Sequence, residues 1–311
     1  MAQTKLEQQL LAIIQDAFPL EELPYQVLAE QLGSDEQSVF AAVENLRQSG
    51  IIRRIGGVYD SKTLGFISRL CAGKVPESAL DAFAAVVNEI PAITHNYVRS
   101  HEYNVWFTVI AQSEAEIQKI VDNVCAKTDL HDVHVLSATK KFKINTVMGA
   151  GAPVDSRQWS VDRKEANKSV LTDNDRSRIH IACDDIPHTL TPFKDWGVSC
   201  DKLREDLALK RMRRFGAILR HQEAGFAFNA MVCFNVTNGG AILAQKPYIS
   251  HCYNRPAFDG FPYTLYAMMH AQSAEELDRH IKEAAESIGN PDYVVLHSVR
   301  ELKKTSFRFF A

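Results

Sequence analysis

Apolar positions recur at helical spacing near the start of the chain and predict three short helices. They fall at residues 4–17, 25–32 and 35–48, and Gly33 closes the second of them. The next stretch, 51–59, alternates in polarity around a glycine pair, which is typical of a β-hairpin. Three helices followed by a hairpin predict a winged helix-turn-helix.

After residue 59 the spacing of the apolar residues alternates between that of strands and that of helices. The order strand, helix, strand, strand, helix, strand predicts a ferredoxin-like unit. The predicted strands are 66–75, 93–98, 105–110 and 133–142, and the predicted helices are 78–90 and 114–126.

The same landmarks return in the same order in the second half of the chain, which indicates an internal duplication. The matched segments are 54–58 with 214–218, 93–97 with 249–253, and 103–106 with 263–266. The second helix-turn-helix region contains Pro187, Pro192 and Gly197, residues that interrupt helices. We therefore expect this second copy of the module to be degenerate.

The predicted fold class is α+β, a tandem duplication of a winged helix-turn-helix plus a ferredoxin-like βαββαβ unit of the Lrp/AsnC type. A polar stretch containing proline and glycine separates the two copies and is expected to be a linker. The expected domains are 1–60, 61–148, 149–168 (the linker), 169–220 (the degenerate module) and 221–311.

Charge argues against nucleic-acid binding. The formal net charge is -3, whereas proteins that bind DNA or RNA usually carry a basic excess or a basic face. The helix predicted at 35–48, which would enter the groove, contains three acidic residues and one arginine. It would repel a phosphate backbone, so we expect no nucleic-acid partner.

Hydrophobicity and cysteine usage predict a cytoplasmic protein. No run of 18 apolar residues exists, and the first residues lack the uninterrupted apolar segment of a signal peptide. The six cysteines include no C-x-x-C pair, so neither a structural zinc site nor a thioredoxin motif is expected. We predict no membrane association and no bound metal.

The predicted order of elements resembles that of the Lrp/AsnC regulators. The repeated motifs resemble those of one branch of this family, the siroheme decarboxylases. Members of that branch consist of two related subunits, AhbA and AhbB, or of fused chains of the NirDL type. The resemblance implies decarboxylation of two acetate side chains of siroheme to didecarboxysiroheme, in haem d1 or siroheme-dependent haem b biosynthesis.

The resemblance also implies no cofactor beyond the iron tetrapyrrole substrate. The two fused copies would form an intramolecular pseudo-dimer, with a homodimer also open. Two alternatives remain at this point. One is an Lrp/AsnC-type transcription regulator, and the other is a non-catalytic tetrapyrrole sensor or carrier.

Decarboxylation of an acetate arm requires a proton donor, and histidine titrates near neutral pH. The resemblance implies a functional histidine in the motif that contains His251, and a second on the last strand, where His297 lies. Ser137 takes the position of His297 in the first copy, which suggests that the copies are specialised. His95 is the counterpart of His251 and either lines a second pocket or is a relic. A structural histidine is the alternative for each.

Arginine is suited to holding the other carboxylates of the substrate because it forms bidentate, charge-assisted hydrogen bonds. Five aromatic side chains are candidates for stacking on the macrocycle, namely Tyr253, Tyr263, Phe226, Phe228 and Trp106, although aromatic residues on strands more often belong to the core. The candidate substrate-binding residues, with His95, are Arg54, Arg99, Arg214, Arg255, Tyr253 and Tyr263. Lys304 is expected to be solvated, and His270 to lie at the surface.

Overall fold

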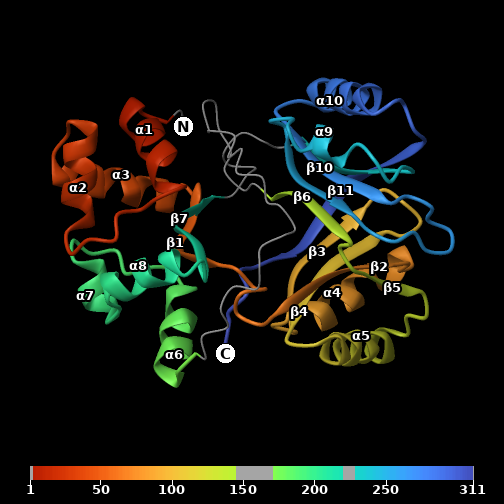
Figure 1. Ribbon diagram of the computed structural model, residues 1–311, viewed down its shortest axis with the longest axis horizontal. Helices are drawn as coiled ribbons and strands as arrows, with labels where there is room; N and C mark the ends of the chain where they lie inside the picture. Colours follow the sequence, from red (N-terminus) through yellow and green to blue (C-terminus); the bar gives the residue numbers. More distant parts are fainter. Residues whose placement is uncertain (1–2, 145–170, 220–227, 311) are drawn as a thin grey trace.

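The computed structural model describes residues 3–144, 171–219 and 228–310. It has a helix-turn-helix lobe and a sheet lobe, which lie side by side in Figure 1. The linker expected at 149–168 lies outside the described residues.

The helix-turn-helix lobe contains one three-helix module from each copy, each followed by a strand. The first module consists of α1 (Lys5–Ile14), α2 (Pro24–Leu32), α3 (Glu36–Gln48) and β1 (Ile52–Tyr59). The second consists of α6 (Asp173–Ala182), α7 (Pro192–Trp196), α8 (Cys200–Ala208) and β7 (Met212–Leu219). Thr4 and Thr172 start the first helix of each module with a capping box.

The expected hairpin wing is wrong, because β1 and β7 pair with each other in an antiparallel ribbon. Gly56 lies opposite Gly216 at its centre. A Cβ on Gly56 would lie 2.2 Å from the carbonyl oxygen of Asp184, and one on Gly216 would lie 2.4 Å from that of Ile14. Each glycine therefore lets its strand lie against the end of the first helix of the other copy.

The second module is complete, so the expectation of a degenerate module is also wrong. Pro192 starts α7, where the missing backbone N–H needs no partner. Gly197 ends the same helix with a φ of 69°, a left-handed conformation that glycine adopts without strain. Pro192 and Gly197 therefore mark the two ends of a helix and do not interrupt one.

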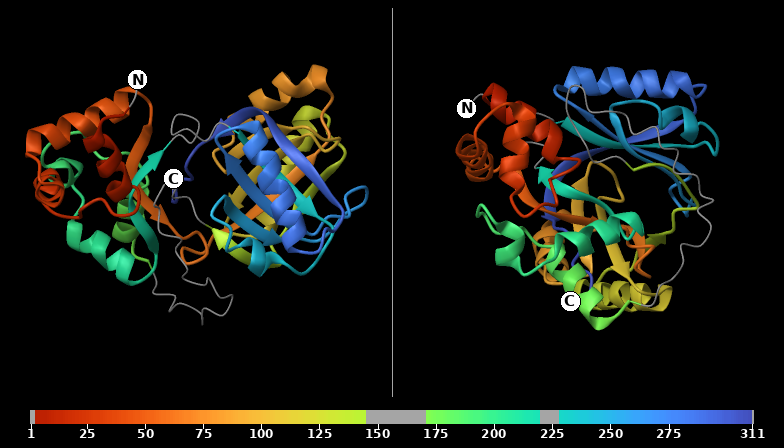
Figure 2. Two further views of the ribbon diagram at one scale, coloured as in Figure 1. Left: turned by 90° about the horizontal axis from the view of Figure 1, so that it is seen from above. Right: turned by 60° about the vertical axis from the view of Figure 1, so that its left-hand side comes forward.

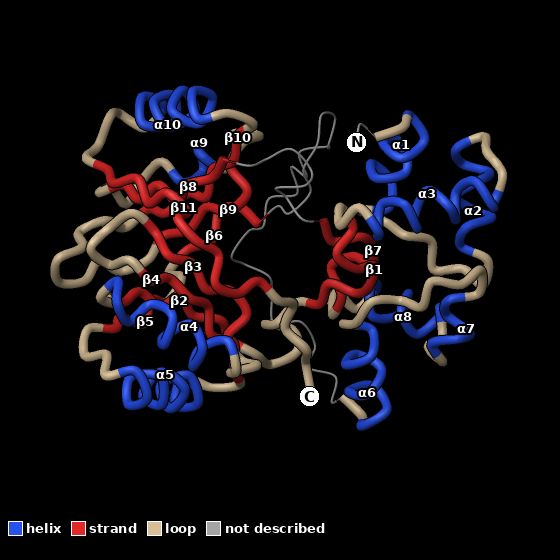
Figure 3. Tube along the Cα trace, turned by 180° about the vertical axis from the view of Figure 1, so that it is seen from behind, coloured by secondary structure: helices blue, strands red, loops and turns tan. Residues whose placement is uncertain are grey.

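The sheet lobe contains two ferredoxin-like units. The first unit comprises β2 (Ile67–Gly73), η1 (Glu77–Ala79), α4 (Leu80–Asn88), β3 (Ile93–Arg99), β4 (Val105–Ala111), α5 (Glu114–Thr128), β5 (Val133–Leu136) and β6 (Lys140–Ile144). The second comprises β8 (Phe228–Phe234), α9 (Gly240–Leu243), β9 (Ile249–Asn254), β10 (Leu265–Ala271), α10 (Ala274–Ser287) and β11 (Tyr293–Lys304). Helices α4 and α5 lie on one side of the strands, and α9 and α10 lie on the other (Figure 3).

The two units exchange strand ends and form one nine-stranded sheet in the order β5-β2-β4-β3-β11-β8-β10-β9-β6. The strand expected at 133–142 is divided: β5 pairs within its own copy, whereas β6 pairs with β9 of the other copy. In return β11 runs beyond β8 and pairs with β3. Copy one is therefore joined to copy two through backbone hydrogen bonds on both sides.

Apolar side chains fill a separate core in each part. One core lies in the helix-turn-helix lobe, and one lies under the helices of each ferredoxin-like unit. A fourth lies between the two halves of the sheet and includes Trp106, Phe261 and Tyr266. This last core brings the equivalent strands of both copies close together.

The segment after β11 connects the two lobes. Phe309 is 5% exposed, and its ring centroid lies 5.1 Å from that of Phe66 within the helix-turn-helix core. His180 on α6 contacts the backbone carbonyl of Phe309, with its Nδ1 3.1 Å from the oxygen. The views in Figure 2 place the C-terminus in the space between the lobes.

Candidate active site

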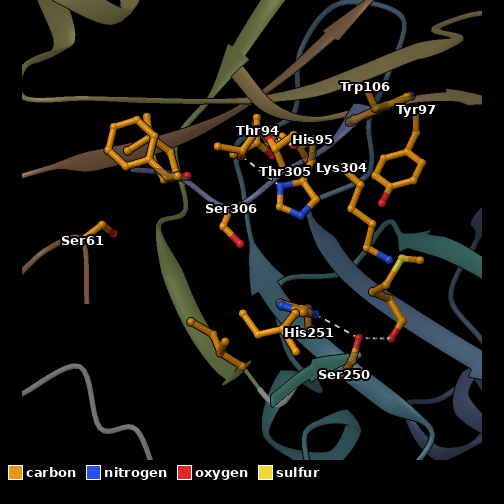
Figure 4. A pocket seen from close by; sticks show the side chains of 18 of the residues that line it. Ser61, Thr94, His95, Tyr97, Trp106, Ser250, His251, Lys304, Thr305 and Ser306 are labelled. Atoms are coloured by element: carbon orange, nitrogen blue, oxygen red, sulfur yellow. Dashed lines mark hydrogen bonds between the residues drawn. The ribbon is translucent and has the colours of Figure 1, made fainter. Parts of the chain in front are cut away.

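A cavity of about 600 Å³ lies between the lobes and is lined by both copies. Strands β2, β3, β4, β6, β8, β9, β10 and β11 all contribute to its lining, and β1, part of β7 and the C-terminal segment close it. Its volume falls within the range of small-molecule sites. Figure 4 shows side chains from both halves of the chain converging on this pocket.

A histidine paired with a hydroxyl occurs twice in the cavity. His95 has its Nδ1 2.9 Å from Oγ1 of Thr94, and His251 has its Nδ1 2.9 Å from Oγ of Ser250. The two imidazoles lie on opposite sides of the pocket in Figure 4. The hydroxyl fixes one ring nitrogen of each histidine, so proton exchange with a substrate would use Nε2.

Each copy also places one arginine in the cavity lining, at the same interval after its histidine. Arg99 donates from Nη1 to the backbone carbonyl of Leu296 at 3.0 Å, and Arg255 donates to that of Leu136 at 2.7 Å. Arg255 also lies over the ring of Tyr253, with its guanidinium carbon 5.3 Å from the centroid. Burial lowers the pKa of Arg99 to about 10 and also lowers that of Arg255. Both cations are thus held rigidly in a poorly solvated place.

The helix-turn-helix lobe adds cationic groups above these strands. Arg53 and Arg54 both donate to Oγ of Ser306, at 2.8 and 3.1 Å. Burial lowers the pKa of Arg54 to about 10. The hydroxyl of the C-terminal segment therefore holds two guanidinium groups at the edge of the cavity.

The cavity is strongly basic. Among the described lining residues the only carboxylate is that of Glu301, against eight basic side chains. These are Arg53, Arg54, Arg99, Lys141, Arg213, Arg255, Arg300 and Lys304. Burial is the main cause that lowers the pKa of both Lys141 and Lys304. An anionic ligand would stabilise the charged form of both lysines, so the site favours a substrate with several carboxylates.

The two copies differ beside their histidines. Lys304 lies opposite His95 where β11 pairs with β3, whereas Ile144 lies opposite His251 where β6 pairs with β9. At this register position His95 therefore has a cation as its neighbour, and His251 has an apolar residue in its place. The expectation that Lys304 is solvated is wrong, because this lysine lines the cavity.

His270 also lines the cavity and is 9% exposed, which contradicts its expected surface position. Its Nε2 lies 2.9 Å from Oγ of Ser250. Residue 110, an isoleucine, takes the equivalent place on β4, because Ile110 pairs with Ser68 as His270 pairs with Asn229. Comparison of the two copies at this position was the signal that could have singled out His270 from the sequence.

Three of the residues selected from the sequence lie outside the described cavity lining. His297 is exposed on β11, and its neighbour Ser298 lines the pocket instead. Arg214 is directed at the backbone carbonyls of Gln15 and Ala217. Tyr263 packs against Phe261 in the core between the sheet halves, with ring centroids 5.0 Å apart. For Arg214 and Tyr263 the predicted role stays a prediction, whereas the exposed position of His297 favours no part for it in the reaction.

The cavity contains the six other selected residues, namely His95, His251, Arg54, Arg99, Arg255 and Tyr253. Throughout residues 3–144, 171–219 and 228–310, no group of three or more His, Cys, Asp or Glu side chains is arranged to hold a metal ion. None of the helices in these ranges is both long and apolar enough to span a membrane.

Family models match both parts of this architecture. A model for an AsnC-like ligand binding domain matches residues 63–143 and again 223–303, which coincides with the two ferredoxin-like units. A model for the siroheme decarboxylase NirDL-like HTH domain matches residues 7–53.

Similar proteins match the chain over nearly its whole length. A siroheme decarboxylase of Hydrogenobacter thermophilus is 34% identical, over 97% of this chain and 94% of the relative. The siroheme decarboxylase alpha subunit of Desulfovibrio desulfuricans is 49% identical over 45% of this chain and 80% of that subunit. The crystal structure of the siroheme decarboxylase NirDL in co-complex with an iron-uroporphyrin III analogue has a TM-score of 0.72 at 27% identity, covering 99% of this chain and 95% of that one.

The duplicated AsnC-like domains, the NirDL-like HTH domain and the full-length relative agree with one another. This chain belongs to the siroheme decarboxylase family.

Proposed function

We propose that this protein is a carboxy-lyase that removes the carboxyl groups of two acetate side chains of siroheme. The observation that carries the proposal is the single basic cavity into which both copies place a histidine–hydroxyl pair, in a chain that matches a siroheme decarboxylase along its length. Siroheme, an iron tetrapyrrole with several carboxylate arms, has the charge that this cavity favours.

The arginines and lysines of the lining would hold the substrate carboxylates that do not react. Arginine forms bidentate hydrogen bonds with a carboxylate, and rigid placement of both partners lowers the cost of orienting the substrate. Arg99 and Arg255 come from equivalent strands, so they can bind carboxylates at opposite edges of one macrocycle. Tyr253 provides an aromatic surface beside Arg255.

The chemical step breaks the bond between the acetate methylene and its carboxyl carbon. Carbon dioxide leaves, and the electron pair stays on the methylene, where the macrocycle delocalises it. One proton then adds to this carbon and leaves a methyl group. We assign delivery of this proton to His251, with His95 at the opposite edge, and require no cofactor besides the iron tetrapyrrole substrate.

Poor solvation also favours the reaction. Burial lowers the pKa of Lys141 and Lys304, which indicates that water solvates charges in this cavity poorly. A carboxylate moved from water into such a place loses hydration that the carbon dioxide product does not need. Ile144, opposite His251, contributes an apolar neighbour at this point.

The test is an anaerobic incubation of the purified protein with siroheme, followed by mass analysis of the extracted tetrapyrrole. The proposal predicts a product that has lost two carboxyl groups in the presence of wild-type protein and no change without it. Tight binding with no mass change would overturn the enzymatic function and favour a tetrapyrrole sensor or carrier. Absence of binding would overturn the substrate assignment.

A further inference from the structure

A chain of two hydrogen bonds connects a buried histidine to the histidine that faces the substrate. Oγ of Ser250 lies 2.9 Å from Nε2 of His270 and 2.9 Å from Nδ1 of His251. One hydroxyl thus lies between two imidazoles. Figure 4 shows the link between Ser250 and His251, with the His251 ring at the edge of the pocket.

The first copy contains only the first two members of this chain. Thr94 and His95 repeat the hydroxyl and the imidazole at the same distance, 2.9 Å. Ile110 takes the place of His270, and its side chain carries no ionisable proton. Both copies therefore contain the histidine–hydroxyl pair, but only the second copy contains the third residue, His270.

We propose that His270 is a positioning residue that supplies protons to His251 through Ser250, so that the copy-two half of the cavity is the half that protonates the substrate. This inference rests on the function proposed above. It adds a buried residue of the cavity lining and assigns different tasks to two histidines that the repeated motif makes look alike.

The hydroxyl of serine suits this task because it donates one proton and accepts at two lone pairs. In the loaded state His270 is protonated and donates from Nε2 to Ser250, and Ser250 donates to Nδ1 of His251. His251 then carries its own proton on Nε2, the nitrogen that can reach the substrate.

The proton balance of one turnover is simple. The carbon–carbon bond breaks, carbon dioxide leaves, and Nε2 of His251 gives its proton to the remaining carbon. Nδ1 of His251 takes the proton of Ser250, and Ser250 takes the proton of His270. The net change is one proton lost from His270 and one carbon–hydrogen bond formed. Solvent water then reprotonates His270, and exchange of the Nδ1 proton of His251 for one on Nε2 restores its starting tautomer.

The surroundings of the two histidines agree with this division. Lys304 lies opposite His95 in the strand register, so this histidine has a cation as its neighbour. Ile144 lies opposite His251, and this histidine is linked through Ser250 to His270. The cation beside His95 is suited to holding a carboxylate, whereas His251 is the histidine that is linked to a second imidazole.

The experiment compares wild type with His270→Ile, which copies the residue of the first unit, and with His270→Gln, which can hydrogen-bond to Ser250 but releases no proton. Initial rates of carboxyl loss from siroheme are measured anaerobically, together with siroheme affinity by absorbance titration. We expect both variants to bind siroheme with wild-type affinity and to lose about 100-fold in kcat. His131→Ala, which removes an exposed histidine outside the described cavity lining, is the control and should stay close to wild type.

Variants of the intervening residue test whether His270 acts through Ser250. Ser250→Thr, which copies Thr94, keeps the hydroxyl and should retain activity, whereas Ser250→Ala should lose as much as His270→Ile. The double variant Ser250→Ala with His270→Ile should lose no more than either single variant, because residues that act as one unit are not additive.

The outcomes separate this inference from the function on which it rests. Inactive wild-type protein would overturn the proposed function itself. Active wild type with His270→Ile within about twofold of its kcat would overturn only the proton supply. Recovery of activity in His270→Gln would also overturn it, because a hydrogen bond alone would then be sufficient.

Discussion

Removal of one buried carboxylate should destabilise the helix-turn-helix lobe strongly. The side chain of Asp206 on α8 is fully buried and lies within hydrogen-bond distance of three groups. It accepts from Tyr59 of the first copy at 3.1 Å, from Arg178 of α6 at 3.1 Å, and from Arg211 at 3.4 Å. Asp206→Ala would leave two arginine side chains, exposed by only 11% and 8%, without this partner.

The expected cost is about 3 kcal/mol, the lower end for breaking a buried ion pair, because Arg178 keeps a second carboxylate partner in Asp175. Equilibrium unfolding in urea, followed by circular dichroism, measures it. At a slope of about 3 kcal/mol per M, the midpoint should fall by about 1 M. Glu205→Ala is the matched control: this neighbouring carboxylate is exposed and paired with Lys202 on the surface, and its midpoint should stay near that of wild type.

A triple variant tests the physical reason rather than the size of the effect. Replacement of Arg178 and Arg211 by Met together with Asp206→Leu removes the whole buried ion group. Apolar side chains of similar volume can substitute for such a group without loss. The midpoint should therefore recover much of what Asp206→Ala loses. An Asp206→Ala protein that unfolds at the urea concentration of wild type would refute the reasoning.

Three further predictions concern the ribbon and the cavity. Gly216→Ala places a methyl group 2.4 Å from the carbonyl oxygen of Ile14 and should cost about 1–3 kcal/mol in urea unfolding, whereas an unchanged midpoint would contradict the close approach. Ser306→Ala removes the hydroxyl that holds Arg53 and should raise the Kd for siroheme in an absorbance titration, and a wild-type Kd would contradict this role. Lys304→Met should weaken siroheme binding and reduce its dependence on salt, and an unchanged salt dependence would exclude a direct charge contact.

The repeated motifs predicted the duplication, and the structure brings four of the residues selected from them to one cavity. His95 and His251 lie at equivalent strand positions, Arg99 and Arg255 follow them by the same interval, and all four line the cavity. Alternation along a strand places every second side chain on one face, so a motif repeated at the same interval reaches the same surface in both copies.

The hydrophobic pattern could not predict which strands pair with each other. The pattern of 51–59 fits any strand, and only the structure pairs it with β7 rather than with a neighbouring hairpin arm. The divided last strand of copy one has the same cause, since β6 pairs with the other copy. Periodicity gives the face of a strand but does not identify the strand beside it.

Burial of single polar residues was also misjudged from local pattern. His270 follows a run of apolar residues near the end of β10 and resembles a surface position, yet it is 9% exposed and its Nε2 lies 2.9 Å from Oγ of Ser250 on β9. Whether such a histidine meets solvent depends on packing between distant parts of the chain.

The most direct test of the account compares His251→Ala with His297→Ala in the anaerobic siroheme assay, with product mass as the readout. The shared cavity contains His251, and His297 lies on the exposed face of β11. We predict that His251→Ala loses carboxyl removal while still binding siroheme, and that His297→Ala keeps the activity of wild type. Full activity in His251→Ala, or loss of activity confined to His297→Ala, would contradict the placement of the reaction in this cavity.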